Sequence, residues 1–238
     1  MKISVCVPFY PWYYDFDRTE ELFRVMIPSM RAAGPENFEL SICDAGIVDK
    51  YGNRAETRSV GALSARLREE WPGELVYTCT DRAFTPPHHE YPSRVWISAA
   101  VNMSVYQSNH PFLFLNNIDI EIPKNFVQEY FANVKDGSPW FPKCYNIRGD
   151  MPRVHEDGGW RHGTGLVGIT RADYLRVGGN DETYIKNRHD SDLFNRCSAM
   201  FAEPGALERN RPLLNGLFHI DHPGTSERTS AFNERGWK

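Results

Sequence analysis

Short apolar runs alternate with amphipathic segments along the first half of the chain. Runs with the length and the β-branched or aromatic content of buried strands lie at Ile3–Val7, Phe38–Cys43, Leu75–Cys79 and Phe112–Leu115. Between them the apolar positions recur at helical spacing, which predicts helices at Glu20–Met30, Gly61–Glu70 and Arg94–Gln107. Strands that alternate with helices are typical of an α/β fold, in which helices cover both faces of a mostly parallel sheet.

The pattern is looser after Pro123. It predicts helices at Lys124–Asn133, Arg171–Val177 and Ser191–Met200, and strands at Trp140–Cys144 and Leu166–Ile169. The polar segment NIRGDMPRVHEDGGWRHGTG ends at Gly165. Loops of this length are uncommon in compact domains unless they have a function, so the segment indicates a lid or a binding loop. No internal repeat or interdomain linker is visible in the sequence, so we expect one domain over residues 1–238.

Composition and charge narrow the class of protein. Hydrophobic residues make up 41% and charged residues 24%, which are globular values, and the net charge of -4 gives no basic footprint for nucleic acid. The five cysteines form no CxxC pair and are odd in number, which suits a reducing compartment. The sequence has no apolar stretch of membrane-span length and no signal-peptide pattern, so we expect a cytoplasmic protein.

Polar and aromatic side chains follow the predicted strands at the point where each strand ends. Residues 8–12 follow the first strand, residues 44–49 the second, and residues 116–119 the strand Phe112–Leu115. In an open parallel sheet, ligands bind in the crevice outside the carboxyl ends of the strands. We therefore expect a binding site lined by Asp, Asn and aromatic residues at this edge.

Several motifs together resemble a known family. The order VPFYPW, ICDAGIVD, FLFLNNID, GTGLVGITRADYLRVGGNDE, RHDSDLFNR and FHIDHPG resembles the GT-A fold glycosyltransferases, particularly family 2. Related neighbours are the β-1,4-galactosyltransferases, bacterial chondroitin polymerase and the polypeptide GalNAc-transferases. The resemblance covers nearly the whole chain. It implies a Rossmann-like GT-A fold with a nucleotide-sugar-binding half at residues 1–123 and a smaller acceptor-binding and catalytic half at residues 124–238.

The resemblance implies a set of donor-binding residues. The segment after the first strand would line the nucleotide pocket, Asp44 would accept a hydrogen bond from the uracil imide, and Asn117-Ile118-Asp119 would be a variant of the D-x-D motif. The segment SRVWISAAVN, through Arg94 and Asn102, resembles the R...N pattern of a helix whose Arg faces the donor. The residues so assigned are Pro8, Phe9, Tyr10, Asp44, Arg94, Asn117, Ile118 and Asp119. Each motif alone also fits an ordinary strand cap, turn or surface residue.

A divalent cation, Mn²⁺ or Mg²⁺, is implied by the same resemblance. Hard divalent cations prefer oxygen ligands and neutralise the charge of a departing diphosphate. Asp119 would bind the metal, whereas Asn117 replaces the first acid of the motif and would face the ribose. The tail segment FHIDHPG places His219 as a further metal ligand, with His222 as the alternative.

The family also implies a catalytic carboxylate and an acceptor loop. The segment GGNDE followed by RHDSDLFNR puts Asp190 at the general base, with Asp192 as runner-up and a residue that binds the acceptor. Asp190 also fits simple N-terminal capping of a helix. The acceptor loop GGWRHGTG would contact a sugar through Trp160, His162 and Gly163.

Together these features predict a metal-dependent, inverting glycosyltransferase that transfers a hexosyl or N-acetylhexosaminyl group. The donor would be a nucleotide sugar, with UDP-sugar favoured, and the acceptor a glycan or other hydroxyl-bearing molecule. A nucleotidyltransferase of similar fold is an alternative, but it would need a Gly-rich, basic loop after the first strand, and VPFYPWYYDF has none. A non-catalytic nucleotide-sugar or carbohydrate-binding module is the other alternative.

Overall fold

The structure is a computed structural model. It describes residues 1–9, 12–13, 16–17, 19–44, 60–79, 97–148, 151–154, 166–182, 189–201 and 213–220.

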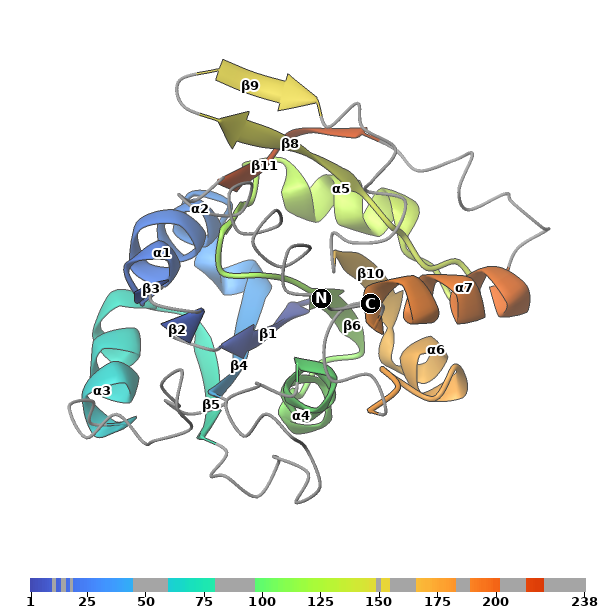
Figure 1. The fold of residues 1–238 in the computed structure, drawn as a ribbon, viewed down its shortest axis with the longest axis horizontal. Coiled ribbons are helices and arrows are strands. Elements are labelled where there is room, and N and C mark those ends of the chain that lie inside the picture. The colour runs from blue at the N-terminus through green and yellow to red at the C-terminus, as the bar shows by residue number, and fades with distance from the viewer. Residues whose placement is uncertain are drawn as a thin grey trace, which may run out of the picture.

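A five-stranded sheet forms the centre of the described fold (Figure 1). Its strands, in spatial order, are β10 (Val167–Thr170), β6 (Phe112–Leu115), β1 (Ile3–Phe9), β4 (Phe38–Asp44) and β5 (Glu74–Cys79). β6, β1, β4 and β5 are parallel, and β10 runs antiparallel to β6 along one edge. The predicted α/β class and the mostly parallel sheet are therefore confirmed.

Helices cover both faces of this sheet, because side chains alternate along each buried strand. In β1, Val5 and Val7 belong to one hydrophobic cluster, and Cys6 between them belongs to the other. The first cluster includes residues of α2 (Ile27–Ala32), α3 (Val60–Glu70) and α5 (Phe126–Asn133). The second includes residues of α4 (Ile97–Gln107), α6 (Arg171–Arg176) and α7 (His189–Phe201).

The predicted helix at Glu20–Met30 is a continuous helical segment with a wider turn inside it. α1 (Thr19–Glu21) leads into a π-helical turn at Leu22–Met26, and α2 follows directly. Pro28 lies in the first turn of α2, where it has no N–H to donate and crowds the preceding turn. The wider turn before Pro28 relieves that crowding without ending the helix.

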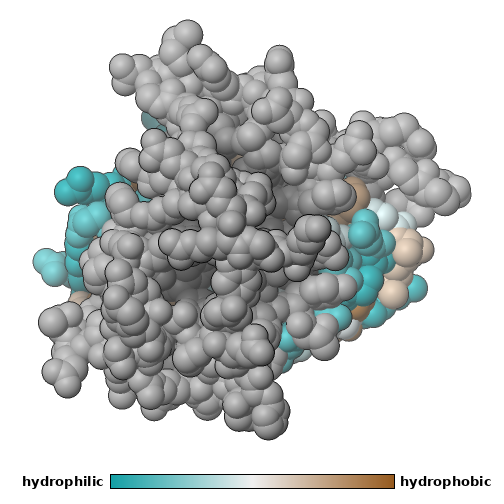
Figure 2. Space-filling view, viewed as in Figure 1, coloured by the Kyte–Doolittle hydropathy of each residue, from teal (hydrophilic) through white to brown (hydrophobic). Residues whose placement is uncertain are grey.

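Charged side chains join α3 to the start of this helical segment. The Arg66 guanidinium pairs with Glu20 at 2.8 Å and with Glu70 at 2.7 Å, and it lies 3.7 Å above the ring of Phe23. In Figure 2 the described surface on the left, over α1 and α3, is correspondingly hydrophilic. Because these groups are exposed, the pairs contribute little to stability.

A second, smaller sheet lies beside the central one. Its order is β7 (Ile120–Glu121), β11 (Leu213–Ile220), β8 (Lys143–Arg148) and β9 (Met151–Val154). In Figure 1, β8, β9 and β11 lie above α5. Two sequence predictions are wrong here: Trp140–Cys144 is not one strand, and the polar segment that follows is not all loop, since it contains most of the β8–β9 hairpin.

Trp140 instead forms an isolated bridge with the central sheet. Its backbone N–H donates to the Gly168 carbonyl at 2.7 Å, and Gly168 N–H donates back at 2.8 Å. The indole packs among Phe114, Phe126 and Tyr130, with ring centroids 5.9–6.5 Å away. A Cβ on Gly168 would lie 2.7 Å from Val134 Cγ2 and 3.0 Å from the indole, so only glycine lets β10 approach this cluster.

Candidate active site

The carboxyl ends of β1, β4 and β6 lie at the same edge of the central sheet. Phe9 lies opposite Asp44 in the β1–β4 register. The Asn116 backbone N–H, just beyond β6, donates to the Cys6 carbonyl oxygen at 3.0 Å. Pro8 and Phe9 are both buried, and Phe9 belongs to the first hydrophobic cluster. The sheet thus brings the described residues at all three strand ends to one edge.

Asp44 ends β4 as a buried carboxylate, only 3% exposed. Its Oδ2 accepts a hydrogen bond from the Tyr77 hydroxyl at 2.6 Å. Tyr77 lies on the neighbouring strand β5, opposite Ile42, and its phenol reaches the strand end from there. A hydrogen bond to an ionised acceptor is strong and directional, so Tyr77 fixes the orientation of the Asp44 carboxylate.

The chain turns directly after β6. The Ile120 N–H donates to the Asn117 carbonyl at 3.4 Å, which closes a turn over residues 117–120. Asp119 is 4% exposed, and the Ile118 side chain belongs to the first hydrophobic cluster. A ligand at this turn would therefore meet the backbone of Ile118 and the side chains of Asn117 and Asp119.

The C-terminal strand of the second sheet passes beside this turn. β11 pairs antiparallel with β7, and in that register the backbone of His219 lies opposite Ile120, the residue after Asp119. β11 also pairs in parallel with β8. The two segments predicted to share a metal are thus neighbours, and a carboxylate with an imidazole is a donor set that suits Mn²⁺.

Asp190 is the second residue of α7, and Asp192 lies one turn before Arg196 on the same helix. The Asp192 Oδ2 accepts from Arg196 Nε at 2.8 Å and from Nη2 at 2.5 Å. Arg196 Nη1 also donates to the Val177 carbonyl at 2.5 Å, which fastens α7 to the end of α6. The Asp192 carboxylate therefore helps to hold Arg196 against the end of α6.

Several predicted site residues lie outside the described residues, and their roles stay predictions. They are Tyr10, Arg94, Trp160, His162, Gly163 and His222.

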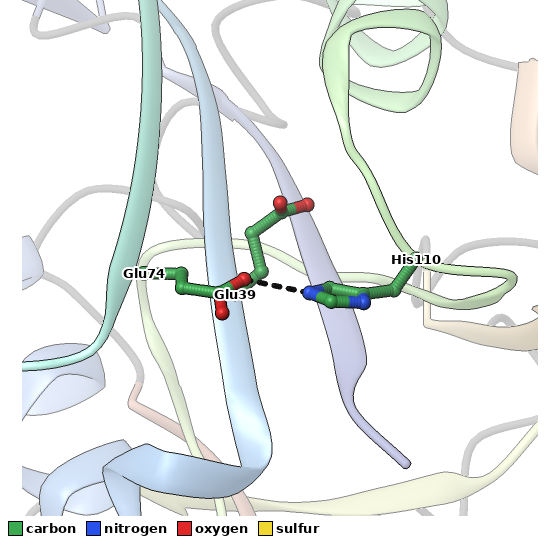
Figure 3. Close-up of side chains that lie close together, drawn as sticks. All are labelled: Glu39, Glu74 and His110. Carbon is green, nitrogen blue, oxygen red and sulfur yellow. Dashed lines mark hydrogen bonds and ion pairs between the residues drawn. The ribbon is translucent and has the colours of Figure 1, made fainter.

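Glu39, Glu74 and His110 form the group in the described part of the chain whose potential metal-ligating atoms all lie within 4.8 Å of one another (Figure 3). The group belongs to the opposite edge of the sheet, near the start of β5 and the α4–β6 connection. His110 Nε2 lies 2.7 Å from Glu74 Oε2, and Lys2 Nζ lies 2.5 Å from Glu74 Oε1. Lys2 already supplies a cation there, so we do not assign a metal to this group.

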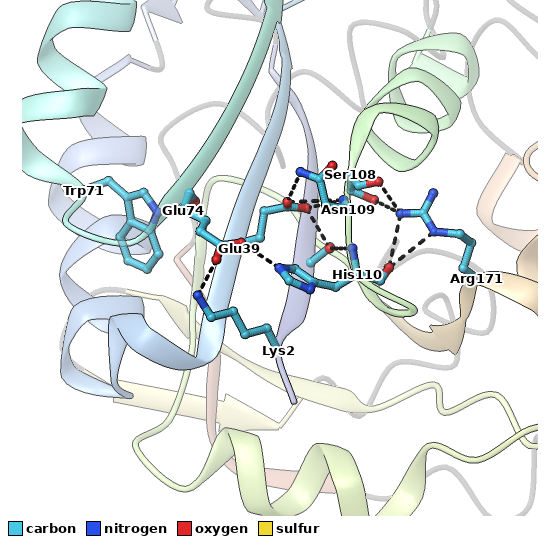
Figure 4. Close-up of polar contacts among 9 residues, drawn as sticks. Lys2, Glu39, Trp71, Glu74, Ser108, Asn109, His110 and Arg171 are labelled. Carbon is cyan, nitrogen blue, oxygen red and sulfur yellow. Dashed lines mark hydrogen bonds and ion pairs between the residues drawn. The ribbon is translucent and has the colours of Figure 1, made fainter.

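Glu39 and Arg171 brace the connection between α4 and β6 (Figure 4). The fully buried Glu39 carboxylate accepts from the Ser4 hydroxyl at 2.8 Å and from the Asn109 backbone and side-chain amides. The Arg171 guanidinium donates to the carbonyl oxygens of residues 105, 108 and 110. These bonds satisfy buried backbone groups and give the edge a structural role.

Sequence reasoning missed Tyr77, which carries no signal beyond its place in a predicted strand. Asn116 was predicted only as part of the polar segment that follows β6, without a role of its own. Asn116 is 1% exposed, and within the described part of the chain neither of its side-chain polar atoms has a hydrogen-bond partner.

Comparisons with known proteins identify the fold. No family model and no curated protein matches the sequence. Among solved structures, S. aureus TarS 1-349 in complex with UDP-GlcNAc superposes with a TM-score of 0.60 at 13% identity, over 94% of this chain and 60% of that chain. The mannosyltransferase PcManGT from Pyrobaculum calidifontis, in complex with GDP-Man and Mn²⁺, superposes with a TM-score of 0.58 at 10% identity, over 98% and 60%.

The chain therefore has the GT-A glycosyltransferase fold, as its motifs indicate, and it spans about three fifths of the length of these similar structures. None of the helices in the described ranges combines the length and the apolar character that crossing a membrane requires.

Proposed function

We propose that this protein is a metal-dependent, inverting glycosyltransferase that takes a sugar from a nucleotide-sugar donor, with UDP-sugar favoured, to a hydroxyl acceptor. One observation carries the proposal: buried Asp44 and Asp119 lie at the shared carboxyl edge of parallel strands in a GT-A fold, where α/β sheets bind their ligands. TarS in complex with UDP-GlcNAc and PcManGT in complex with GDP-Man support a nucleotide sugar as the donor class.

The donor half of the proposed site uses the ends of β1, β4 and β6. Asp44, oriented by Tyr77, accepts a hydrogen bond from the imide N–H of the base. Asn117 bonds the ribose through its side-chain amide. The buried positions of Pro8 and Phe9 close the floor of the nucleotide pocket.

Asp119 and His219 would hold Mn²⁺ or Mg²⁺, with His222 as the alternative imidazole. The low exposure of Asp119 and the pairing of its neighbour Ile120 with His219 support this donor set. When bound, the ion would neutralise charge on the diphosphate leaving group.

Asp190 accepts the proton of the acceptor hydroxyl as that oxygen attacks the anomeric carbon. Its position in the first turn of α7 supports this role, because the positive end of the helix dipole favours an ionised carboxylate by about 0.3–1 kcal/mol. In this proposal the acceptor sugar is bound by four residues that the resemblance implies, Trp160, His162, Gly163 and Asp192.

Donor binding and hydrolysis test the proposal directly. Thermal shift against a panel of UDP- and GDP-sugars, with and without Mn²⁺, should show stabilisation by one donor, since a ligand that binds only the native state raises its stability. The same donor should release its nucleoside diphosphate slowly when Mn²⁺ is present. Asp119→Ala and the isosteric Asp119→Asn should both abolish that release.

Asp136→Ala is the matched control, because Asp136 is an exposed acid on the turn after α5. It should hydrolyse the donor at the wild-type rate. The proposal fails if no nucleotide sugar binds or is cleaved with metal present. The metal assignment alone fails if Asp119→Asn keeps full activity and full Mn²⁺ dependence.

A further inference from the structure

A buried amide in the middle of α4 joins that helix to the segment between α6 and α7. Asn102 is 3% exposed, and its side chain faces the turn formed by residues 178–182. α4, α6 and α7 lie on the same face of the sheet (Figure 1), where all three contribute to the second hydrophobic cluster.

Every hydrogen-bonding position of the Asn102 amide is used. Its Oδ1 accepts from the Tyr174 hydroxyl at 2.6 Å and from the Asn180 backbone N–H at 2.9 Å. Its Nδ2 donates to the Asn180 carbonyl at 2.9 Å and to Glu182 Oε1 at 2.7 Å. A primary amide offers two donor hydrogens and two acceptor lone pairs, so this set is complete.

The turn held by Asn102 cannot easily take another shape. Gly178 and Gly179 both have positive φ, at 87° and 68°. A Cβ on Gly179 would lie 2.9 Å from Asn102 Oδ1, so the backbone passes directly against the amide. The Tyr174 hydroxyl donates to the same amide oxygen, Asn102 Oδ1. Burial raises the pKa of this phenol, so the hydroxyl stays protonated and remains a hydrogen-bond donor.

The same turn leads the chain towards α7. Glu182 is exposed to solvent, yet its carboxylate accepts a hydrogen bond from the side-chain amide of the buried Asn102. From the other direction, Arg196 of α7 donates to the Val177 carbonyl at the start of the turn. Asn102 thus anchors one end of the turn to α4, and Arg196 anchors the other end to α7, the helix that carries Asp190.

We propose that Asn102 is a positioning residue for the acceptor half of the site: it fixes Glu182 and the 178–182 turn, and through them the start of α7 with Asp190. The inference rests on the proposed function for its catalytic consequence. Asn102 itself touches no reacting atom. Its effect is on where the carboxylate lies, and a displacement of about 1 Å in such a group can cost up to about 100-fold in rate.

Asn102→Asp is the most informative change, because it keeps the size of the side chain. The new carboxylate can still accept from Tyr174 and from Asn180 N–H, but it cannot donate, and it faces the like charge of Glu182. We expect kcat for donor hydrolysis to fall at least about tenfold while KM for the donor changes less than about twofold, since the described donor residues lie at the ends of β1, β4 and β6 and do not contact the 178–182 turn through Asn102. Amide hydrogen exchange should become faster over residues 178–201.

The double variant Asn102→Asp with Glu182→Gln tests the bond itself. The amide introduced by Glu182→Gln can donate to the carboxylate introduced by Asn102→Asp, so the polarity of the bond is reversed and no like charges meet. We expect part of the lost kcat to return, together with slower exchange at the start of α7, because the bond between positions 102 and 182 is restored whereas the bond to the Asn180 carbonyl is not. Ser104→Ala is the matched stability control, because Ser104 is a fully buried polar residue of α4 that donates within its own helix and not to the turn.

The results with these variants either support or overturn the positioning role of Asn102. The inference is overturned if Asn102→Asp lowers kcat no more than Ser104→Ala does. It is also overturned if Glu182→Gln alone abolishes hydrolysis and the double variant stays inactive, since Glu182 would then react directly. If the wild-type chain cleaves no donor, the proposed function fails separately, and hydrogen exchange still decides whether Asn102 holds the turn.

Discussion

The Tyr77–Asp44 hydrogen bond gives a prediction that concerns both stability and ligand binding. Tyr77→Phe removes the phenol oxygen and leaves the ring, so no cavity forms and the loss is one bond to a buried carboxylate. Hydrogen bonds to charged groups contribute about 1.5–3 kcal/mol to stability. For a chain of this size, about 2–4 °C of Tm corresponds to each kcal/mol, so Tm should fall by about 3–12 °C.

The variant should also bind nucleotide less tightly. The Asp44 side chain loses the hydrogen bond from Tyr77 that orients it, and ordering one side chain costs about 0.5–1.5 kcal/mol, or roughly two- to tenfold in Kd. Thermal unfolding measures the fall in Tm and urea unfolding the loss of free energy, both followed by tryptophan fluorescence, and calorimetric titration with UDP measures the change in affinity. Tyr106→Phe is the control, because Tyr106 is exposed.

Equal urea midpoints for Tyr77→Phe and Tyr106→Phe would refute the stability argument. A normal stability loss with unchanged UDP affinity would show that Asp44 does not read the base, and would remove it from the proposed donor site.

Gly168→Ala should destabilise the fold by about 1–3 kcal/mol in urea unfolding, because its Cβ overlaps Val134 and Trp140; unchanged stability would mean that β10 shifts freely. Burial raises the pKa of Cys6 and of Cys197 to about 12, so both thiols should react with a disulfide reagent only in the unfolded chain, and rapid native labelling of either would contradict this. Bonds from Lys2, and then His110, lower the pKa of Glu74 below its usual 4.5, so this carboxylate stabilises the fold above that pH and its contribution is lost as the pH falls. Glu74→Gln should therefore lose less than about 1 kcal/mol at neutral pH and nothing in acid; an equal loss at both would refute the charge argument.

The sequence predicts the central sheet well because its strands are short apolar runs between helices of clear period. Ile3–Val7, Phe38–Cys43 and Phe112–Leu115 all lie within strands of that sheet. The antiparallel direction of β10 does not follow from its apolar run, since a buried strand reads the same in either direction. The second sheet was missed because β8 and β9 contain Arg, Asn and Pro, which lower strand propensity.

Some residues of the candidate site could also be predicted from the sequence, whereas others could not. Asp44 and the 116–119 segment were predictable, because polar residues at the ends of parallel strands must gather at one edge. Tyr77 and Asn102 act through partners on other elements, and no local pattern in a sequence encodes such pairings. His219 was assigned by resemblance alone, and its position opposite Ile120 depends on pairing between distant strands.

That pairing has a consequence for how the molecule comes to be assembled. β7 can find its partner in β11 only after the ribosome has made nearly all of the described chain, whereas β1, β4, β5 and β6 are complete long before. The order of synthesis separates the two sheets and the length of the closing loop does not, because the β1–β6 pairing joins segments about as far apart in the sequence as β7 and β11. A nascent chain should thus be able to pair β1, β4, β5 and β6 before His219 reaches its place opposite Ile120, and the proposed metal-dependent donor binding should appear only when β11 has been made.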